Sequence, residues 1–109
     1  MRMQRMRGHD VFGAVGDPTR RAVLDMLRRG ELGAGEIARP FRMSRPAISQ
    51  HLRVLKDAGL VVARRHGREQ RYSLRPSPLR SVDEWLEHYR SFWSEKLSAL
   101  GDYLRDGAN

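Results

Sequence analysis

The chain has 109 residues, enough for one domain with one hydrophobic core and too few for two. Its formal net charge at pH 7 is +8, and it contains no cysteine, which excludes a disulfide framework and any metal site built from thiolates. No apolar run approaches the roughly 20 residues of a membrane span, and none follows the basic N-terminus as in a secretion signal. We therefore expect a cytoplasmic protein without a membrane partner.

The positive charge is concentrated in one part of the chain. Residues 39–75 contain ten lysines and arginines against two acids, so this segment carries the whole net charge. A local excess of this kind favours binding to a polyanion such as nucleic acid. The alternative is a solvated basic surface that only maintains solubility. Residues 1–8 are expected to form a flexible basic arm ahead of a single domain over residues 9–109.

The first half of this domain predicts three helices. Apolar positions at helical spacing indicate a short helix over residues 9–15. Asp17 is a suitable cap for a second helix over residues 18–29, and Pro18 takes its first position, where proline is tolerated. A connection over residues 31–35 is expected to lead into a third short helix over residues 34–39.

Residues 44–58 predict the helix around which the rest of the domain is organised. Ser44 is a suitable N-cap, and Gly59 can adopt the left-handed conformation that follows a helix. The face opposite the core is polar and basic, without a carboxylate in its first three turns. With the preceding helix, this segment is typical of a helix-turn-helix. The predicted core face carries Ile48, Leu52 and Leu55.

After Gly59 the period of the apolar residues changes from 3.6 to 2, which predicts a β-hairpin over residues 60–74. Gly67 suits a turn position with positive φ. We interpret the hairpin as the basic wing of a winged helix-turn-helix, so the expected fold is mainly α with a small β-hairpin. The alternative is a basic hairpin whose charges only maintain solubility and prevent its edge strand from pairing with another chain.

Residues 77–104 predict one last helix of roughly 40 Å. Its wide apolar stripe holds both tryptophans of the chain, and a small winged domain cannot bury such a stripe alone. The stripe therefore favours a homodimer through the terminal helices, although part of it is expected to cover its own core. The predicted interface residues are Phe12, Trp85, Tyr89, Phe92, Trp93, Leu97, Leu100 and Leu104.

The exposed face of helix 44–58 predicts contacts with base edges in the major groove of double-stranded DNA. Arg45, Ser49 and Gln50 are the candidates, because arginine matches guanine and glutamine matches adenine through two hydrogen bonds. Ser44 is assigned to a phosphate at the amide end of the helix. His51 has two open interpretations, a bond to phosphate or one to the backbone of its own domain.

Longer basic side chains are assigned to the DNA backbone, because arginine and lysine reach phosphates beside a groove. This group lies on the later turns of the helix and on the hairpin. It comprises Arg53, Lys56, Arg64, Arg68 and Arg71.

Between residues 10 and 75 the order and spacing of several motifs resemble the ArsR/SmtB family of bacterial winged-helix repressors. The motifs are Asp17-Pro18-Thr19-Arg20, Glu36-Ile37-Ala38, Ser44-Arg45-Pro46-Ala47-Ile48-Ser49-Gln50-His51-Leu52, Ala58-Gly59-Leu60-Val61 and Gly67-Arg68. The aromatic tail is similar to that of the metal-independent, SdpR-like members. The resemblance implies a homodimeric transcriptional repressor that binds an inverted-repeat operator.

The chain departs from the metal sensors of that family. Gly33 and Gly35 stand where the sensors have two cysteines, so the resemblance implies no thiolate-bound metal and we expect no cofactor. Glu84 and His88 could share a metal on the last helix, but a solvated acidic face explains them better. No residue pattern identifies an effector.

Two further classes compete with a specific regulator. A non-specific nucleoid-type DNA- or RNA-binding module would show the same basic segment, and a protein-interaction domain would use the aromatic helix on another partner. An enzyme is not expected, since the sequence suggests neither a nucleophile paired with a base nor a glycine-rich phosphate loop.

Overall fold

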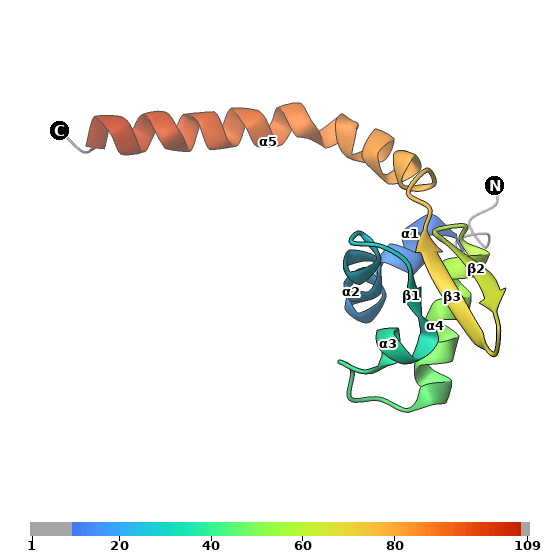
Figure 1. The fold of residues 1–109 in the computed structure, drawn as a ribbon. Coiled ribbons are helices and arrows are strands. Elements are labelled where there is room, and N and C mark those ends of the chain that lie inside the picture. Colours follow the sequence, from blue (N-terminus) through green and yellow to red (C-terminus); the bar gives the residue numbers. More distant parts are fainter. Residues whose placement is uncertain (1–9, 108–109) are drawn as a thin grey trace.

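A computed structural model describes residues 10–107. A body formed by residues 10–75 carries one long helix that projects away from it (Figure 1). The expected N-terminal arm over residues 1–8 lies outside the described residues. In chain order the elements are α1 (Val11–Val15), α2 (Pro18–Leu27), β1 (Leu32–Gly33), α3 (Ala34–Ala38), α4 (Arg45–Asp57), β2 (Val61–His66), β3 (Glu69–Leu74) and α5 (Leu79–Gly107).

Side-chain caps set where three of the helices begin. Asp10 accepts a hydrogen bond from the Gly13 amide at 2.7 Å, so α1 begins at Val11, later than predicted. Asp17 accepts from the Arg20 amide at 3.0 Å and begins α2, which ends at Leu27 rather than at residue 29. Each cap satisfies an amide that has no partner inside its helix, which stabilises the helix by about 1 kcal/mol.

The hydrophobic core lies between the helices of the body and the first strand of the hairpin. The predicted core face of α4 is confirmed, and Val54 joins it. Phe41 and Leu79 are partly buried and pack against this core. None of the fully buried core residues among residues 10–107 belongs to α5. The buried residues are Ala14, Val23, Leu24, Leu27, Ile37, Ile48, Leu52, Val54, Leu55, Leu60 and Val61.

The sheet has three antiparallel strands in the order β1-β3-β2. The predicted hairpin is confirmed, and Gly67 adopts a φ of 66° in its turn. Strand β1 was not predicted from the sequence, because a strand of two residues is too short to show an alternating pattern. Leu32 of β1 pairs with Tyr72, which places β3 in the middle of the sheet. Both edges of β3 are therefore occupied.

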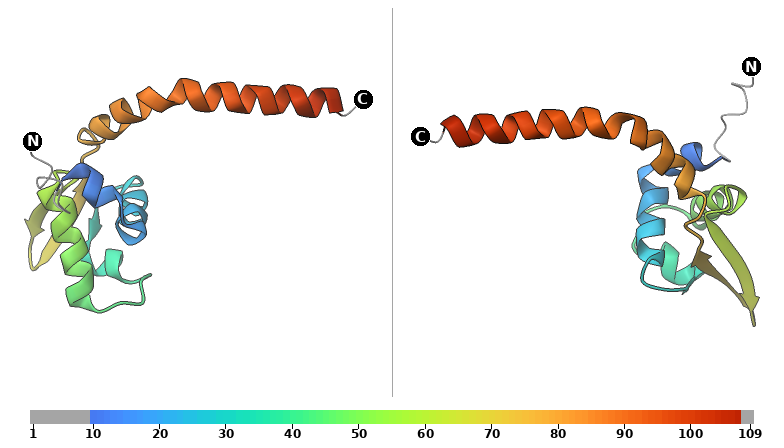
Figure 2. Two further views of the ribbon diagram at one scale, coloured as in Figure 1. Left: turned by 180° about the vertical axis from the view of Figure 1, so that it is seen from behind. Right: turned by 90° about the horizontal axis from the view of Figure 1, so that it is seen from above.

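Helix α5 leaves the body after a turn at Pro76, whose carbonyl accepts from the Leu79 amide at 2.9 Å. It begins later and ends later than the predicted range 77–104, and its 29 residues span about 43 Å. Its first turns lie against α1, where the rings of Phe12 and Trp85 meet edge to face with centroids 6.0 Å apart. Beyond these turns the helix runs clear of the body (Figure 2).

Candidate DNA interface

Helix α4 separates an apolar face from a polar face along its whole length. Ile48, Leu52 and Leu55 are at most 3% exposed, because they pack into the core. The residues assigned to base edges, Arg45, Ser49 and Gln50, are all exposed, as are Ser44, Arg53 and Lys56. The structure thus leaves all six of these side chains accessible to a nucleic acid.

The N-terminal end of α4 is organised by its cap. The Ser44 hydroxyl oxygen accepts from the Ala47 amide at 3.2 Å, and Pro46 occupies the first turn, where it needs no N–H partner. The remaining amides of this turn lie at the positive end of the helix dipole, beside the exposed Arg45 side chain. This end of α4 therefore favours a phosphate.

The wing presents three exposed arginines, which are Arg64, Arg65 and Arg68. Arg65 donates from Nε to the Gly67 carbonyl at 3.3 Å, which holds part of its side chain across the turn. The predicted phosphate contacts Arg64 and Arg68 project from β2 and from the turn into solvent.

Arg71 is placed differently from the other predicted phosphate contacts. Its guanidinium is surrounded by carboxylates, with nitrogen-to-oxygen distances of 3.2 Å to Glu69, 3.4 Å to Glu31 and 3.7 Å to Glu36. Its hydrogen bond with Glu69 raises the pKa of Arg71 above its usual value, and Glu31 adds to the effect. Because β3 is the middle strand, Arg71 faces β1 and α3 and holds the base of the wing against them.

Gly33 and Gly35 lie beside this cluster and differ in the space around them. A Cβ atom added at Gly33 would lie 1.8 Å from Oε2 of Glu69, whereas one added at Gly35 would meet no atom within 4 Å. The Gly33 amide donates to Glu36 at 2.8 Å. Neither glycine has a side chain that could supply a ligand atom to a metal.

The contacts of His51 within its own domain are with side chains, and its alternative role, a bond to phosphate, stays a prediction. Its ring is half-buried with a side-chain exposure of 20%, and Nδ1 lies 3.1 Å from Nη1 of Arg20. The Asp17 carboxylate lies 3.9 Å from the same nitrogen. The ring therefore contacts side chains of α2 and its cap rather than the backbone, and these contacts turn Nδ1 toward the protein.

The acidic residues of α5 do not form a metal site. Asp83, Glu84, Glu87 and His88 line one shallow pocket, but Arg90 pairs with Asp83 and with Glu87 at 2.6 Å. The bond to Asp83 raises the pKa of Arg90. Among the residues that the structure describes, no group of three or more potential ligands could hold a metal ion.

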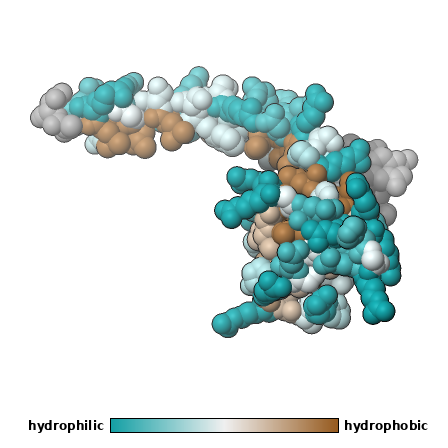
Figure 3. Space-filling view, in the orientation of Figure 1, coloured by the Kyte–Doolittle hydropathy of each residue, from teal (hydrophilic) through white to brown (hydrophobic). Residues whose placement is uncertain are grey.

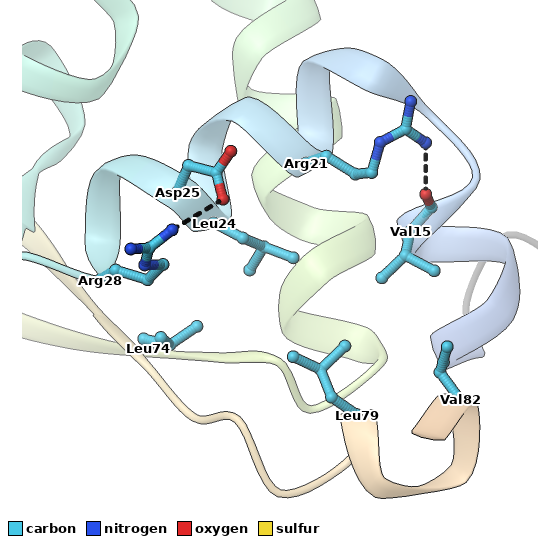
Figure 4. Close-up of a pocket in the computed structure, with 8 residues that line it drawn as sticks. All are labelled: Val15, Arg21, Leu24, Asp25, Arg28, Leu74, Leu79 and Val82. Carbon is cyan, nitrogen blue, oxygen red and sulfur yellow. Dashed lines mark hydrogen bonds and ion pairs between the residues drawn. The ribbon is translucent and has the colours of Figure 1, made fainter. Parts of the chain in front are cut away.

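A second pocket, of about 400 Å³, lies where α5 leaves the body (Figure 4). Leu24 of α2, Leu74 of β3, and Leu79 and Val82 of α5 form its apolar wall. Arg21, Asp25 and Arg28 stand at one side of it, and Arg28 faces Asp25 at 3.8 Å.

Neither α5 nor any other helix between residues 10 and 107 is long and apolar enough to cross a membrane.

A helix-turn-helix followed by a basic β-hairpin, with an exposed face that has no carboxylate in the first three turns of the second helix, defines a winged helix-turn-helix DNA-binding protein. Residues 17–62 match the family described as "Bacterial regulatory protein, arsR family". Together with the relatives described next, this match shows that the chain belongs to the ArsR family.

Two relatives and one solved structure show how far the likeness extends. The chain is 41% identical over 81 residues to the transcriptional repressor SdpR of Bacillus subtilis, an alignment that covers 74% of this chain and 90% of that protein. It is 44% identical over 94 residues to the HTH-type transcriptional regulator Rv2034 of Mycobacterium tuberculosis, covering 86% and 85%. A crystal structure of an ArsR family transcriptional regulator matches with a TM-score of 0.68 and 36% identity, covering 76% and 91%.

These findings establish the general function. The protein is a sequence-specific DNA-binding transcriptional regulator of the ArsR family, and its relatives are named as regulators rather than as enzymes. The family profile ends at residue 62, before most of the wing and before α5. The positions assigned to DNA and to a dimer rest on the geometry described above.

Proposed function

We propose that the protein is a homodimeric transcriptional repressor that binds an inverted-repeat operator in double-stranded DNA. The observation that carries this proposal is the polar face of α4, where Arg45, Ser49 and Gln50 are exposed along a helix whose other face is buried. The name of SdpR as a transcriptional repressor supports repression as the outcome. Occupation of a promoter by the dimer would exclude the transcription machinery.

In this arrangement each α4 enters the major groove of one half-site, with half-sites about 34 Å apart. Arg45, Ser49 and Gln50 read base edges, while Arg53 and Lys56 meet phosphates. Arg64 and Arg68 of the wing contact the flanking backbone. Arg71 is left out of the proposed interface because its three carboxylate partners compete with phosphate. His51 keeps only Nε2 for a bond to phosphate, because Nδ1 faces Arg20.

The apolar side of α5 supports the homodimer. Eight large apolar side chains of this helix are between 45% and 71% exposed. Figure 3 shows the distal ones gathered along one side of α5, with hydrophilic residues on the other. A two-fold axis would let the same stripe cover its own copy, as in most dimers. Full burial of an exposed side chain of this kind contributes roughly 1.5–3 kcal/mol, so each of these half-exposed side chains would add roughly half of that.

The DNA mode is tested by selecting bound sequences from a random duplex pool with the full chain. We expect an inverted repeat whose half-sites are one helical turn apart. Gln50→Ala should relax base choice at one position of each half-site and cost about 1–3 kcal/mol there. A selected pool without a preferred sequence would refute the operator, and an unchanged profile for Gln50→Ala would refute this assignment.

Arg68→Ala serves as the matched control for readout. It should weaken binding to all sequences alike and reduce the dependence of log affinity on log salt by about 0.9 for each phosphate that Arg68 neutralises. Selective loss of the preferred sequence in this variant would assign base reading to the wing instead.

The dimer is tested with substitutions at two adjacent positions of α5, one within the apolar stripe and one outside it. Leu97→Asp places a charge in the apolar stripe, whereas Ser98→Asp places the same charge on the polar side. In sedimentation velocity at micromolar concentration, we expect the wild type and Ser98→Asp to sediment as dimers and Leu97→Asp as a monomer. A monomeric wild type would contradict the proposal.

A further inference from the structure

Arg20 joins three elements of the body through one guanidinium group. Nε donates to the Ala14 carbonyl at 2.8 Å, Nη2 donates to the Gly13 carbonyl at 3.1 Å, and Nη1 lies 3.1 Å from Nδ1 of His51. Arg20 itself belongs to α2, Gly13 and Ala14 form the end of α1, and His51 lies in the middle of α4. These bonds are partly buried, so water competes with them only in part.

The chemistry of this junction requires arginine. Carbonyl groups in the last turn of a helix lack their usual partners within the helix. Arg20 supplies two donors there, one to the Ala14 carbonyl and one to the Gly13 carbonyl, which also accepts from the Gly16 amide. A lysine carries its donors on a single nitrogen, whereas arginine holds three nitrogens in a planar fork and can reach three separate acceptors. Two of the three acceptors here are in α1 and the third is in α4, so the guanidinium group of Arg20 links these two helices.

The same bond orients the ring of His51. Arginine has only donors, so Nδ1 is the acceptor of this bond. The charged neighbours of the ring are Arg20 and, 3.9 Å from Nδ1, the Asp17 carboxylate. Asp17 also accepts from the Arg20 amide at 3.0 Å, so the carboxylate and the guanidinium are anchored to the same turn of α2.

The junction continues toward α5. Phe12 precedes Gly13 in α1, and its ring meets the ring of Trp85 at a centroid distance of 6.0 Å. A continuous set of contacts thus runs from Trp85 through α1 to Arg20 and ends at His51, next to Gln50 on the polar face of α4. The two ends of this set are the predicted dimer face and the predicted base-reading face.

We propose that Arg20 is a positioning residue that sets the placement of α4 relative to α1, and thereby couples the geometry of the dimer to DNA recognition. This inference rests on the proposed function. An operator fixes the distance between the two copies of α4, so specific binding requires each copy to be held at one position relative to the dimer face. Non-specific binding through phosphates does not require this spacing.

The test compares specific and non-specific DNA affinity in variants of the junction. Arg20→Met keeps most of the length of the side chain and removes its donors. We expect it to remain a dimer by sedimentation and to lose about tenfold in affinity for the selected operator. Affinity for unrelated duplex of the same length should change by less than about twofold, since phosphate contacts alone supply it. Equal operator affinity in Arg20→Met and the wild type would overturn the proposal.

Variants of His51 keep the test valid if Arg20→Met fails to fold. His51→Asn offers an oxygen near the position of Nδ1 and can still accept from Arg20, whereas His51→Leu cannot. We expect His51→Asn to retain most of the operator affinity and His51→Leu to lose it about as Arg20→Met does. Equal losses in the two His51 variants would show that the Arg20 bond does not matter.

A double-mutant cycle completes the experiment. If Arg20 acts through His51, the double variant Arg20→Met/His51→Leu should bind the operator no worse than either single variant. Losses that simply multiply would assign the two residues to independent roles and refute the coupling. A wild type that binds no inverted repeat would refute the proposed function instead, so the two failures are distinguishable.

Discussion

The body and α5 use apolar residues in opposite ways. The body buries eleven apolar side chains, four of them from α4 alone. Helix α5 carries eight large apolar side chains that are all at least 45% exposed. Both regions show the same helical spacing of apolar residues in the sequence. The difference teaches that an apolar stripe predicts a buried surface but does not say whether the burying partner is the same chain or another copy.

The polar groups of the two regions differ as well. In the body, polar bonds connect elements that are far apart in the sequence, as in those from Arg71 to Glu31 and from Arg20 to His51. The ion pairs found within residues 79–107 of α5 join residues of the same helix. They connect Arg90 to Asp83 and Glu87, and Arg105 to Asp102. Local pairs stabilise a helix without fixing where it lies, so the direction of α5 depends on its packing against α1 and on the proposed partner.

The largest expected effect separates the stability of the two regions. In the background of Leu97→Asp, which we expect to be monomeric, Leu55→Ala should lower the free energy of unfolding by about 2–5 kcal/mol, because Leu55 is fully buried. Leu100→Ala should change it by less than about 0.5 kcal/mol, because Leu100 is 51% exposed. Urea denaturation followed by circular dichroism measures both. Equal losses would contradict the division into body and projecting helix.

A smaller effect is expected at the cap of α2. Asp17→Ala should cost about 1 kcal/mol at pH 7, since it removes an N-cap within the body. Burial acts to raise the pKa of Asp17, but the bond from the Arg20 amide and the electrostatic interactions with His51 and Arg20 outweigh it and lower the pKa below its usual value of 3.8. No comparable effect is expected from an exposed acid on α5.

The sign of the pH dependence follows from that lowered pKa. A carboxyl with a lower pKa in the folded state stabilises the protein fully above its unfolded pKa, and this stabilisation is lost as the pH falls through the folded value. The difference in unfolding free energy between the wild type and Asp17→Asn should therefore be constant near neutral pH and shrink below about pH 4. A difference that grows on acidification would show that the charge of Asp17 destabilises the fold.

The smallest expected effects are two changes in stability of opposite sign, one at the cap of α3 and one within α3. Gly33→Ala forces the Glu69 carboxylate away from Arg71 and should cost up to about 1 kcal/mol, as for an exposed ion pair. Gly35→Ala meets no atom and should stabilise the body by up to about 1 kcal/mol, since alanine favours a helix. Thermal denaturation of the pair measures both shifts. A loss at Gly35 would show that its backbone needs more freedom than α3 suggests.

Much of the body could be predicted from the sequence because the deciding interactions are local. The Asp17 and Ser44 caps act over three residues, and the buried face of α4 follows from helical periodicity. Gly59 and Gly67 have the positive φ values expected at the end of a helix and in a hairpin turn. The exposed candidates on α4 follow from the same periodicity, since the residues opposite a buried face lie in solvent.

The tertiary structure alone decided the roles of residues whose partners are distant in the chain. Arg71 bonds to Glu31 across 40 residues, and Arg20 meets His51 across 31, so no local pattern could assign them. Strand β1 was too short to be recognised and exists because β3 offers it an edge. The sequence by itself determined which surfaces are apolar, charged or capped, because these depend on neighbours along the chain. Which of those surfaces face each other depends on packing, and that only the folded molecule decided.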